Sequence, residues 1–210
     1  MNTILDIHTH RADATDALIA TNPLQFDPQP GLWYSVGFHP WLEIDKLSEK
    51  DFELLERCAR HRQVLAIGET GMDRMRGADL DVQAAVFIRH MQLAHDLGKP
   101  VVTHCVRAAK DILAARRKVL LNEVTLIIHG MRSNEHVART LLDDGCYLSY
   151  GRHFNPEALC TTPLDRLLIE TDEAPVTIIE VAEQIALALH LTTEQIISQA
   201  TANASRVLGI

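Results

Sequence analysis

The sequence lacks the features that would place the protein in a membrane or outside the cell. No run of eighteen apolar residues occurs, and the first residues, MNTILDIHTHRAD, contain neither a basic segment nor a long apolar one. We therefore expect no membrane span, no membrane partner and a cytoplasmic location. No Ser/Gly-rich linker interrupts the chain, so we expect one domain over residues 1–210.

Paired cysteines and an excess of positive charge are also missing. The four cysteines, Cys58, Cys105, Cys146 and Cys160, are scattered singly, without the C-x-x-C spacing of zinc knuckles and redox centres. We expect them to be reduced thiols. The formal net charge of −8 argues against a protein that coats nucleic acid, because such binding needs clustered Lys and Arg. A nucleic-acid end held through metal ions remains compatible with this charge.

Histidine, by contrast, is abundant, with eleven residues in 210. Packing alone does not require so many, so we expect several to take part in chemistry. Five of them fall on predicted helices, mostly at helix ends or outer faces, where ordinary surface roles are expected. These five are His61, His90, His95, His136 and His190.

Short apolar or β-branched runs recur along the chain and predict eight strands. The predicted strands are Thr3–Ile7, Ala17–Thr21, Trp33–Phe38, Val64–Ile67, Pro100–Thr103, Val124–Ile128, Cys146–Ser149 and Leu167–Glu170. Helical segments separate most of them, which allows either a closed parallel barrel or an open doubly wound sheet. Too few residues separate the first strands for full helices, so part of the helical ring is expected to be reduced there.

Capping pairs and apolar stripes mark the predicted helices. Ser48 with Asp51, Thr177 with Glu180 and Thr192 with Gln195 have the spacing that satisfies free N–H groups of a first turn. A further helix is expected from Ser133 to Gly145. On the long helix after the fourth strand, a core-facing stripe is expected at Val82, Val86, Leu93 and Leu97.

Polar residues that suit metal binding follow the apolar runs. His8 and His10 are two apart on the first strand, so both side chains point to the same face. Single carboxylates and histidines recur at later strand ends, as Glu69, His104, His129 and Asp172. In a closed barrel these ends meet in one ring, where barrel active sites lie. The placement of the polar residues therefore favours the (β/α)₈ barrel.

Ionisable groups gathered in one pocket need compensating charge, which one or two cations supply. The mixture of nitrogen and oxygen ligands suits Zn²⁺, Mn²⁺ or Mg²⁺, and six ligands exceed the four of a closed structural zinc site. We therefore predict two divalent metal ions that activate water for hydrolysis.

These residues stand in a sequence that resembles the TatD-related deoxyribonucleases, metal-dependent hydrolases with an amidohydrolase-like barrel. The matching segments are HTH at residues 8–10, VGFHP at 36–40, IGETGMD at 67–73, PVVTH at 100–104, IHG at 128–130 and LIETD at 168–172, together with Gln83, Phe87 and Pro175. The chain departs from the family after His129, where Gly130-Met131-Arg132 stands, in having Arg107 displaced by one position, and in Glu173 after the aspartate.

The resemblance implies a role for each of the predicted ligands. His8 and His10 would bind one cation, His104 and His129 the other, with Glu69 as a bridge and Asp172 completing the first site. It also implies a phosphodiesterase that acts on nucleic-acid ends through a metal-bridging hydroxide, with Asp172 as the group that handles the proton.

Three residues are predicted to contact the substrate. His39, Arg107 and Arg132 are predicted to hold an anionic group such as a DNA or RNA phosphate. The alternatives are an amide or carboxyl-ester hydrolase, for example one that deacylates aminoacyl-tRNA, and a non-catalytic metal-binding protein. The chain is expected to be a monomer or a weak dimer.

Overall fold

Eight parallel strands form the central sheet. The protein is described here by a computed structural model over residues 3–210. The strands are β1 (Asp6–Thr9), β2 (Ala17–Thr21), β3 (Trp33–Val36), β4 (Val64–Asp73), β5 (Val101–Val106), β6 (Leu126–Ile128), β7 (Tyr147–Tyr150) and β8 (Leu167–Ile169). They follow one another in chain order and the sheet closes as a barrel, which confirms the predicted (β/α)₈ class.

Seven α helices and three short 3-10 turns connect the strands in the described part of the chain. They are η1 (Pro23–Gln25), η2 (Ile44–Lys46), α1 (Glu49–Ala59), α2 (Leu80–Leu97), α3 (Ala109–Lys118), α4 (Glu135–Asp143), α5 (Pro156–Thr161), η3 (Leu164–Arg166), α6 (Ile178–Leu189) and α7 (Thr193–Leu208). The three predicted capping pairs begin α1, α6 and α7. The predicted start of α4 at Ser133 was wrong by two residues, because the side chain of Asn134 caps the helix and its first turn begins at Glu135.

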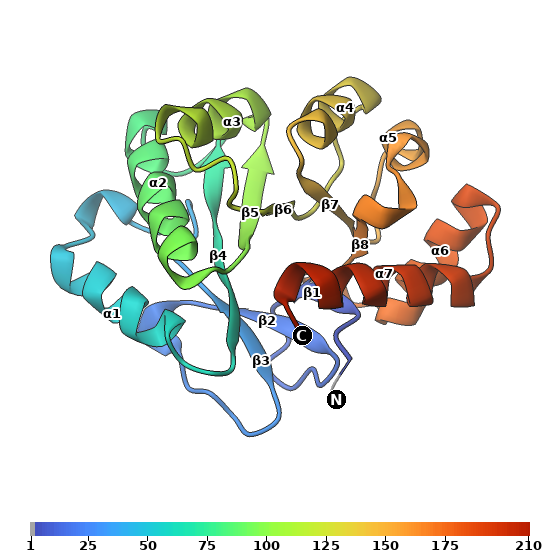
Figure 1. Ribbon diagram of the computed structural model, residues 1–210, viewed down its shortest axis with the longest axis horizontal. Helices are drawn as coiled ribbons and strands as arrows, with labels where there is room; N and C mark the ends of the chain where they lie inside the picture. The colour runs from blue at the N-terminus through green and yellow to red at the C-terminus, as the bar shows by residue number, and fades with distance from the viewer. Residues whose placement is uncertain (1–2) are drawn as a thin grey trace. The chain divides into compact units, whose positions relative to one another are not determined.

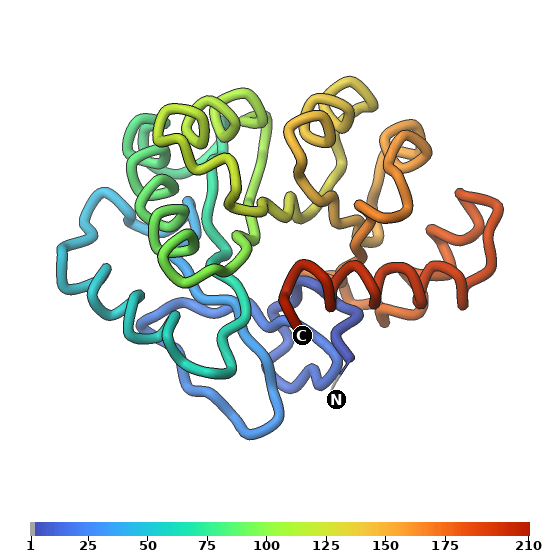
Figure 2. Tube along the Cα trace, viewed as in Figure 1, coloured from blue at the N-terminus to red at the C-terminus, as the bar shows by residue number. Residues whose placement is uncertain are grey.

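The first two connections carry little helix, as the sequence predicted. Residues 10–16, between β1 and β2, form turns, and η1 with its three residues is the helical element between β2 and β3. Figure 2 follows the chain from β2 to α1 as a mostly irregular trace. Among the described residues, no helix has both the length and the apolar character needed to cross a bilayer.

The chain divides into two compact units, one made of the residues up to Ile19 with Ile127–Ile210, the other of Ala20–Leu126. In the second unit β3, β4 and β5 pair in parallel, and α2 packs on β4 (Figure 1). The expectation of a single domain stays a prediction.

The face of α2 that packs inward differs from the predicted stripe. Val86 is buried as expected, but Val82, Leu93 and Leu97 are only half-buried. The buried residues of the helix are Gln83, Val86, Phe87, His90, Met91 and Ala94. The inner face therefore includes a glutamine and a histidine, which an apolar pattern cannot reveal.

In the unit that contains both chain ends, β1 pairs with β2 and β8, while β6, β7 and β8 pair in order. Helix α7 packs on β8 and against α6 (Figure 1). Asn203 is fully buried on α7 and donates hydrogen bonds to the carbonyl oxygens of Leu164 and Leu167 at 2.7 and 2.8 Å. This amide fastens the last helix to the start of β8.

Candidate metal centres

A first group of metal-ligating side chains lies in the Ala20–Leu126 unit. Oε1 of Glu69 lies 2.8 Å from Nδ1 of His104 and 2.9 Å from Nε2 of His39. The two imidazole nitrogens are 3.3 Å apart. Glu69 and His104 are buried, and His39 is half-buried. Three donor atoms from different segments therefore converge on one point.

The strands bring these side chains together through close backbone contact. Glu69 lies inside β4 rather than beyond its end, because the strand continues to Asp73 beside β5. Gly71 pairs with His104, and its φ of +145° belongs to a region that side chains disfavour. A Cβ at this position would lie 2.1 Å from the carbonyl oxygen of His104. A glycine is therefore required for β4 to approach the backbone of His104.

The side chain of Asp73 contacts the opposite edge of the same imidazole ring. Its Oδ2 lies 3.2 Å from Nε2 of His104 and accepts a 2.7 Å hydrogen bond from the indole of Trp41. Its Oδ1 accepts a 2.7 Å hydrogen bond from the backbone of Met75. Burial by itself raises the pKa of this carboxyl, but the hydrogen bonds it accepts outweigh burial and lower the pKa from its ordinary value. From the sequence, Asp73 has no predicted role beyond its place in the family-like segment 67–73.

A second group lies in the unit that contains both chain ends. Oδ1 of Asp172 is 3.7 Å from Nε2 of His8 and 3.7 Å from Nε2 of His10. The backbone arranges this group, since the N–H of Asp172 donates to His8 and the N–H of His10 donates to Asp172. The H-x-H spacing thus places both rings beside one carboxylate, as the strand period predicted.

His129 and Glu170 extend this second group. The ring centroids of His129 and His8 are 4.2 Å apart, with the ring planes tilted by 40°, and Nδ1 of His129 lies 3.6 Å from Oε1 of Glu170. Glu170 is fully buried, and the same Oε1 accepts a 2.6 Å hydrogen bond from the backbone of Gly130. Its Oε2 has no hydrogen-bond partner among residues 3–210. Glu170 also belongs to a possible ligand triad with His129 and Asp172, which the sequence analysis did not identify.

A buried hydrogen-bonded pair, Asp6 and Thr171, lies next to the second group in the chain. Asp6 accepts hydrogen bonds from the hydroxyl of Thr171 at 2.5 Å and from its backbone N–H at 3.0 Å. Burial raises the pKa of Asp6 to about 6, against these hydrogen bonds, which lower it. Arg11 donates to the same Thr171 hydroxyl at 3.2 Å. The contacts join the beginning of β1 to the residue that precedes Asp172.

The predicted anion-binding arginines lie on the surface. Nη2 of Arg132 is 3.9 Å from Oδ2 of Asp172, and its side chain is 59% exposed. Arg107 directly follows β5, is exposed and has a φ of +53°. His39, predicted as a substrate contact, instead lies within hydrogen-bonding distance of Glu69. The substrate roles of these three residues remain predictions.

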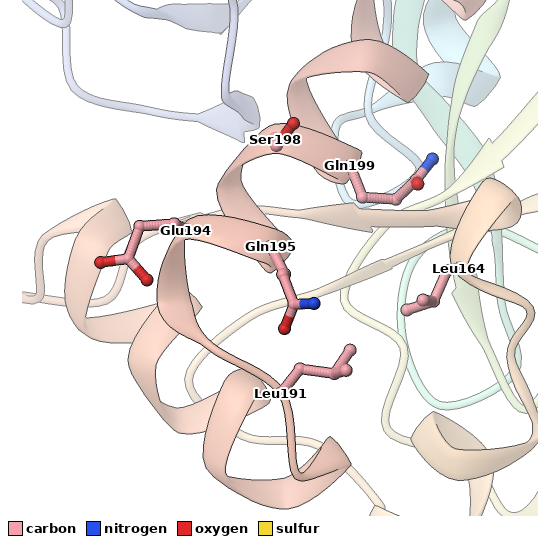
Figure 3. Close-up of a pocket in the computed structure, with 6 residues that line it drawn as sticks. All are labelled: Leu164, Leu191, Glu194, Gln195, Ser198 and Gln199. Atoms are coloured by element: carbon pink, nitrogen blue, oxygen red, sulfur yellow. The ribbon is translucent and has the colours of Figure 1, made fainter.

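An open hollow of about 410 Å³ lies beside the first turns of α7 (Figure 3). Its lining residues are Leu164, Leu191, Glu194, Gln195, Ser198 and Gln199. Glu194 is the one carboxylate among them, and no histidine lines the hollow. The two histidine-containing groups are therefore candidate metal sites, and this hollow is not.

The donor groups fit divalent cations. The first offers two imidazole nitrogens and one carboxylate oxygen at mutual distances of 3.3 Å or less, as expected of ligands about 2.0–2.2 Å from a shared ion. The second contains a buried carboxylate oxygen without a partner, a costly arrangement that a cation relieves. Oxygen and nitrogen donors of this kind suit Zn²⁺ or Mn²⁺.

Comparison with known proteins agrees with this chemistry. The family model described as TatD related DNase matches residues 24–209. The "uncharacterized metal-dependent hydrolase YcfH" of Escherichia coli K12 is 32% identical over 198 residues, covering 84% of this chain and 74% of that protein. The human "3'-5' RNA nuclease TATDN2" is 29% identical over 181 residues, covering 78% of this chain and 24% of that protein.

Among solved structures, the TatD homologue YjjV of Escherichia coli superposes with a TM-score of 0.82 at 16% identity. The superposition covers 100% of this chain and 98% of YjjV. At this level of identity, the likeness supports the barrel fold.

Proposed function

Because this chain belongs to the TatD-related DNase family of metal-dependent hydrolases, we propose that it hydrolyses phosphodiester bonds at the ends of nucleic acids with the aid of divalent cations. The observation that carries the proposal is the convergence of Glu69, His39 and His104. Such a set, with two buried donors and one half-buried donor, is expected of a cation site rather than of a packed core.

The residues of the first group would hold a cation through Oε1 of Glu69 and the imidazole of His104. His39 is only half-buried, so its ring is accessible both to a cation and to a substrate oxygen. We propose that His39 contacts both the cation and a substrate oxygen, which keeps its predicted role in phosphate binding.

The residues of the second group would hold a cation through His8, His10 and Asp172. We also place His129 with this group, beside His8 and Glu170, and not with His104 as the resemblance implied. Bound cations lower the pKa of water and stabilise negative charge that develops on a phosphate oxygen. Asp172 is the carboxylate suited to proton transfer, because 26% of its side chain is exposed and can exchange protons with solvent. Its carboxylate would take a proton from the attacking water and deliver it to the leaving oxygen.

The guanidinium of Arg132 near Asp172 supports a phosphate as the group that is attacked. The guanidinium of Arg132 lies 3.9 Å from Oδ2 of Asp172 and has most of its surface free to solvent. A guanidinium matches the geometry of phosphate oxygens. We propose that Arg132 and Arg107 hold substrate phosphates, and that Glu69 bridges two cations as the family resemblance implies.

The proposal is tested by assaying hydrolysis with metal-free protein to which Mg²⁺, Mn²⁺ or Zn²⁺ is returned. The substrates are end-labelled single-stranded DNA and RNA, a p-nitrophenyl phosphodiester and an aminoacyl-tRNA. We expect phosphodiester cleavage from an end that depends on added cation. Cleavage of the aminoacyl ester alone would instead support the amide and ester hydrolase alternative.

Glu69→Gln provides the matched variant, since it keeps the shape of the side chain but removes its charge. We expect loss of bound cation and a fall in activity of at least about 100-fold, beyond the effect typical of residues that only support a ligand. Glu53→Gln, at an exposed position on α1, is the control and should behave as the wild type. Full activity of Glu69→Gln would refute the metal assignment.

A further inference from the structure

The carboxylate of Asp73 and the carboxylate of Glu69 contact opposite nitrogens of one imidazole. Oε1 of Glu69 lies 2.8 Å from Nδ1 of His104, while Oδ2 of Asp73 lies 3.2 Å from Nε2. Asp73 is 3% exposed and His104 is 6% exposed. The ring is therefore held between two carboxylates in a buried setting, and its two nitrogens must serve different purposes.

An ionised carboxylate can only accept hydrogen bonds, so the nitrogen that faces Asp73 must carry a proton. We propose that Asp73 is a positioning residue that keeps the proton of His104 on Nε2 and thereby directs the lone pair of Nδ1 to the cation. This inference rests on the proposed function, because it requires a cation beside Glu69. The partner of the distal nitrogen commonly sets the tautomer of a metal-bound histidine.

The surroundings of Asp73 fix its carboxylate for this purpose. Trp41 donates to Oδ2 at 2.7 Å, and the backbone of Met75 donates to Oδ1 at 2.7 Å. Gln83, buried on α2, accepts from the backbone N–H of Asp73 at 2.7 Å and donates to its carbonyl oxygen at 3.1 Å. Both the main chain and the side chain of Asp73 are therefore held in place.

The contacts of Asp73 show that its side chain does more than cap the following turn. Capping the turn requires only Oδ1 of Asp73, which accepts a hydrogen bond from the backbone N–H of Met75 at the start of the following loop. Oδ2 serves the indole and the imidazole instead. A carboxylate is required at this point, because all three neighbours present donors and an amide can accept through only one of its two ends.

In Asp73→Asn the amide nitrogen therefore faces at least one of these donors in either orientation of the side chain, and that donor loses its acceptor. If the amide nitrogen faces His104, it favours an unprotonated Nε2 and moves the proton to Nδ1, which blocks the lone pair. We expect the affinity for the cation bound by His104 to fall 10–100-fold. Asp96→Asn, at an exposed carboxylate near the end of α2, is the control and should keep wild-type affinity.

The direct test is ¹⁵N NMR of histidine-labelled wild-type protein loaded with Zn²⁺, which needs no variant of Asp73. The signals of His104 are assigned as those missing from His104→Gln. We expect Nε2 to carry a proton and Nδ1 to show the shift of a metal-bound nitrogen. A metal-bound Nε2 would overturn the inference, and so would unchanged cation affinity in a folded Asp73→Asn variant whose His104 has lost the proton on Nε2.

Failure of the inference and failure of the proposed function give different results. If wild-type protein binds no cation through His104, the proposed metal centre itself is wrong. If the cation binds but is attached through Nε2, the metal centre stands and only the role of Asp73 is refuted. Circular dichroism of Asp73→Asn establishes that the variant is folded before its affinity is interpreted.

Discussion

The backbone N–H of Phe38 donates a 3.0 Å hydrogen bond to Nε2 of His90, which lies in the middle of α2. Nδ1 of the same ring lies 2.8 Å from the carbonyl oxygen of Val86. A neutral imidazole with its proton on Nδ1 satisfies both contacts, whereas a second proton on Nε2 would break the first. Burial lowers the pKa of His90 to about 4.

This environment predicts a dependence of stability on pH. The pKa of His90 is about 4 in the folded protein against 6.5 for an unperturbed histidine, so the unfolded chain binds more protons between these values. The contribution of His90 to the free energy of unfolding is complete above pH 6.5 and declines as the pH falls towards 4. The loss amounts to about 3 kcal/mol.

Urea denaturation at a series of pH values compares wild type with His90→Gln, which has no ionisable group at this position. We expect the free energy of unfolding of the wild type to fall more steeply below pH 6.5 than that of the variant. His136→Gln, on the exposed side of α4, is the control and should follow the wild type. Parallel pH profiles for wild type and His90→Gln would contradict the prediction.

Gly71→Ala should disrupt the first group of ligands. The new Cβ would lie 2.1 Å from the carbonyl oxygen of His104, and a φ of +145° strains any side chain. We expect a loss of at least about 3 kcal/mol in the free energy of unfolding, together with weaker cation binding. Urea denaturation and metal titration measure the two effects.

Gly98→Ala is the matched control for backbone strain. Gly98 also has a positive φ, of +62°, but a Cβ there would meet no atom within 4 Å. We expect this variant to lose about 1 kcal/mol and to bind cations normally. Equal losses in the two variants would show that the contact with His104 is not the cause.

Asn203→Ala should loosen α7 from the start of β8. The substitution removes both hydrogen bonds to the carbonyl oxygens of Leu164 and Leu167 and leaves the buried acceptor of Leu167 without this donor. We expect a loss of about 2–4 kcal/mol in the free energy of unfolding. Ser198→Ala, exposed on the same helix (Figure 3), should change it by less than about 0.5 kcal/mol in urea denaturation.

Glu170→Gln tests the second ligand group. The substitution keeps an acceptor for Gly130 but removes the charge of a buried carboxylate that lacks a partner on Oε2. We expect cation affinity to fall 10–100-fold. At saturating Zn²⁺ or Mn²⁺, this reduces the stabilisation gained on metal binding by about 1.4–2.7 kcal/mol.

Thermal unfolding with and without cation measures this stabilisation directly. Glu183→Gln, at an exposed position on α6, serves as the control and should retain the full metal-dependent rise in melting temperature. An undiminished rise in Glu170→Gln would exclude Glu170 from the support of the cation.

The strand order and the placement of the predicted ligands followed from local patterns. Apolar runs revealed all eight strands, and the period of two placed His8 and His10 beside Asp172. Parallel strands bring the same ends together, so residues far apart in sequence could be grouped without knowledge of the loops. This reasoning needs only chain order and periodicity.

The supporting residues could not be predicted in this way. Asp73 contacts His104 because β4 continues past Gly71, and its second partner, Trp41, comes from a loop. The buried environment of Glu170 depends on the backbone of Gly130. His90 was wrongly expected on an outer helix face, because its burial depends on Phe38, which local sequence does not connect with α2.

The side chain of Gln83 reaches from α2 to the loop that follows β4, where its Nε2 also donates to the carbonyl oxygens of Arg76 and Ala78. The loop is thus held through its main-chain atoms. The side chains of Arg74, Met75 and Arg76 are exposed, although Arg74 pairs with Asp111 and Arg76 lies over the ring of Trp41. The hydrogen bonds that Gln83 makes to this loop do not involve these three side chains. The chemistry of this edge can therefore change by substitution while the backbone of Asp73 and its contact with His104 stay in place.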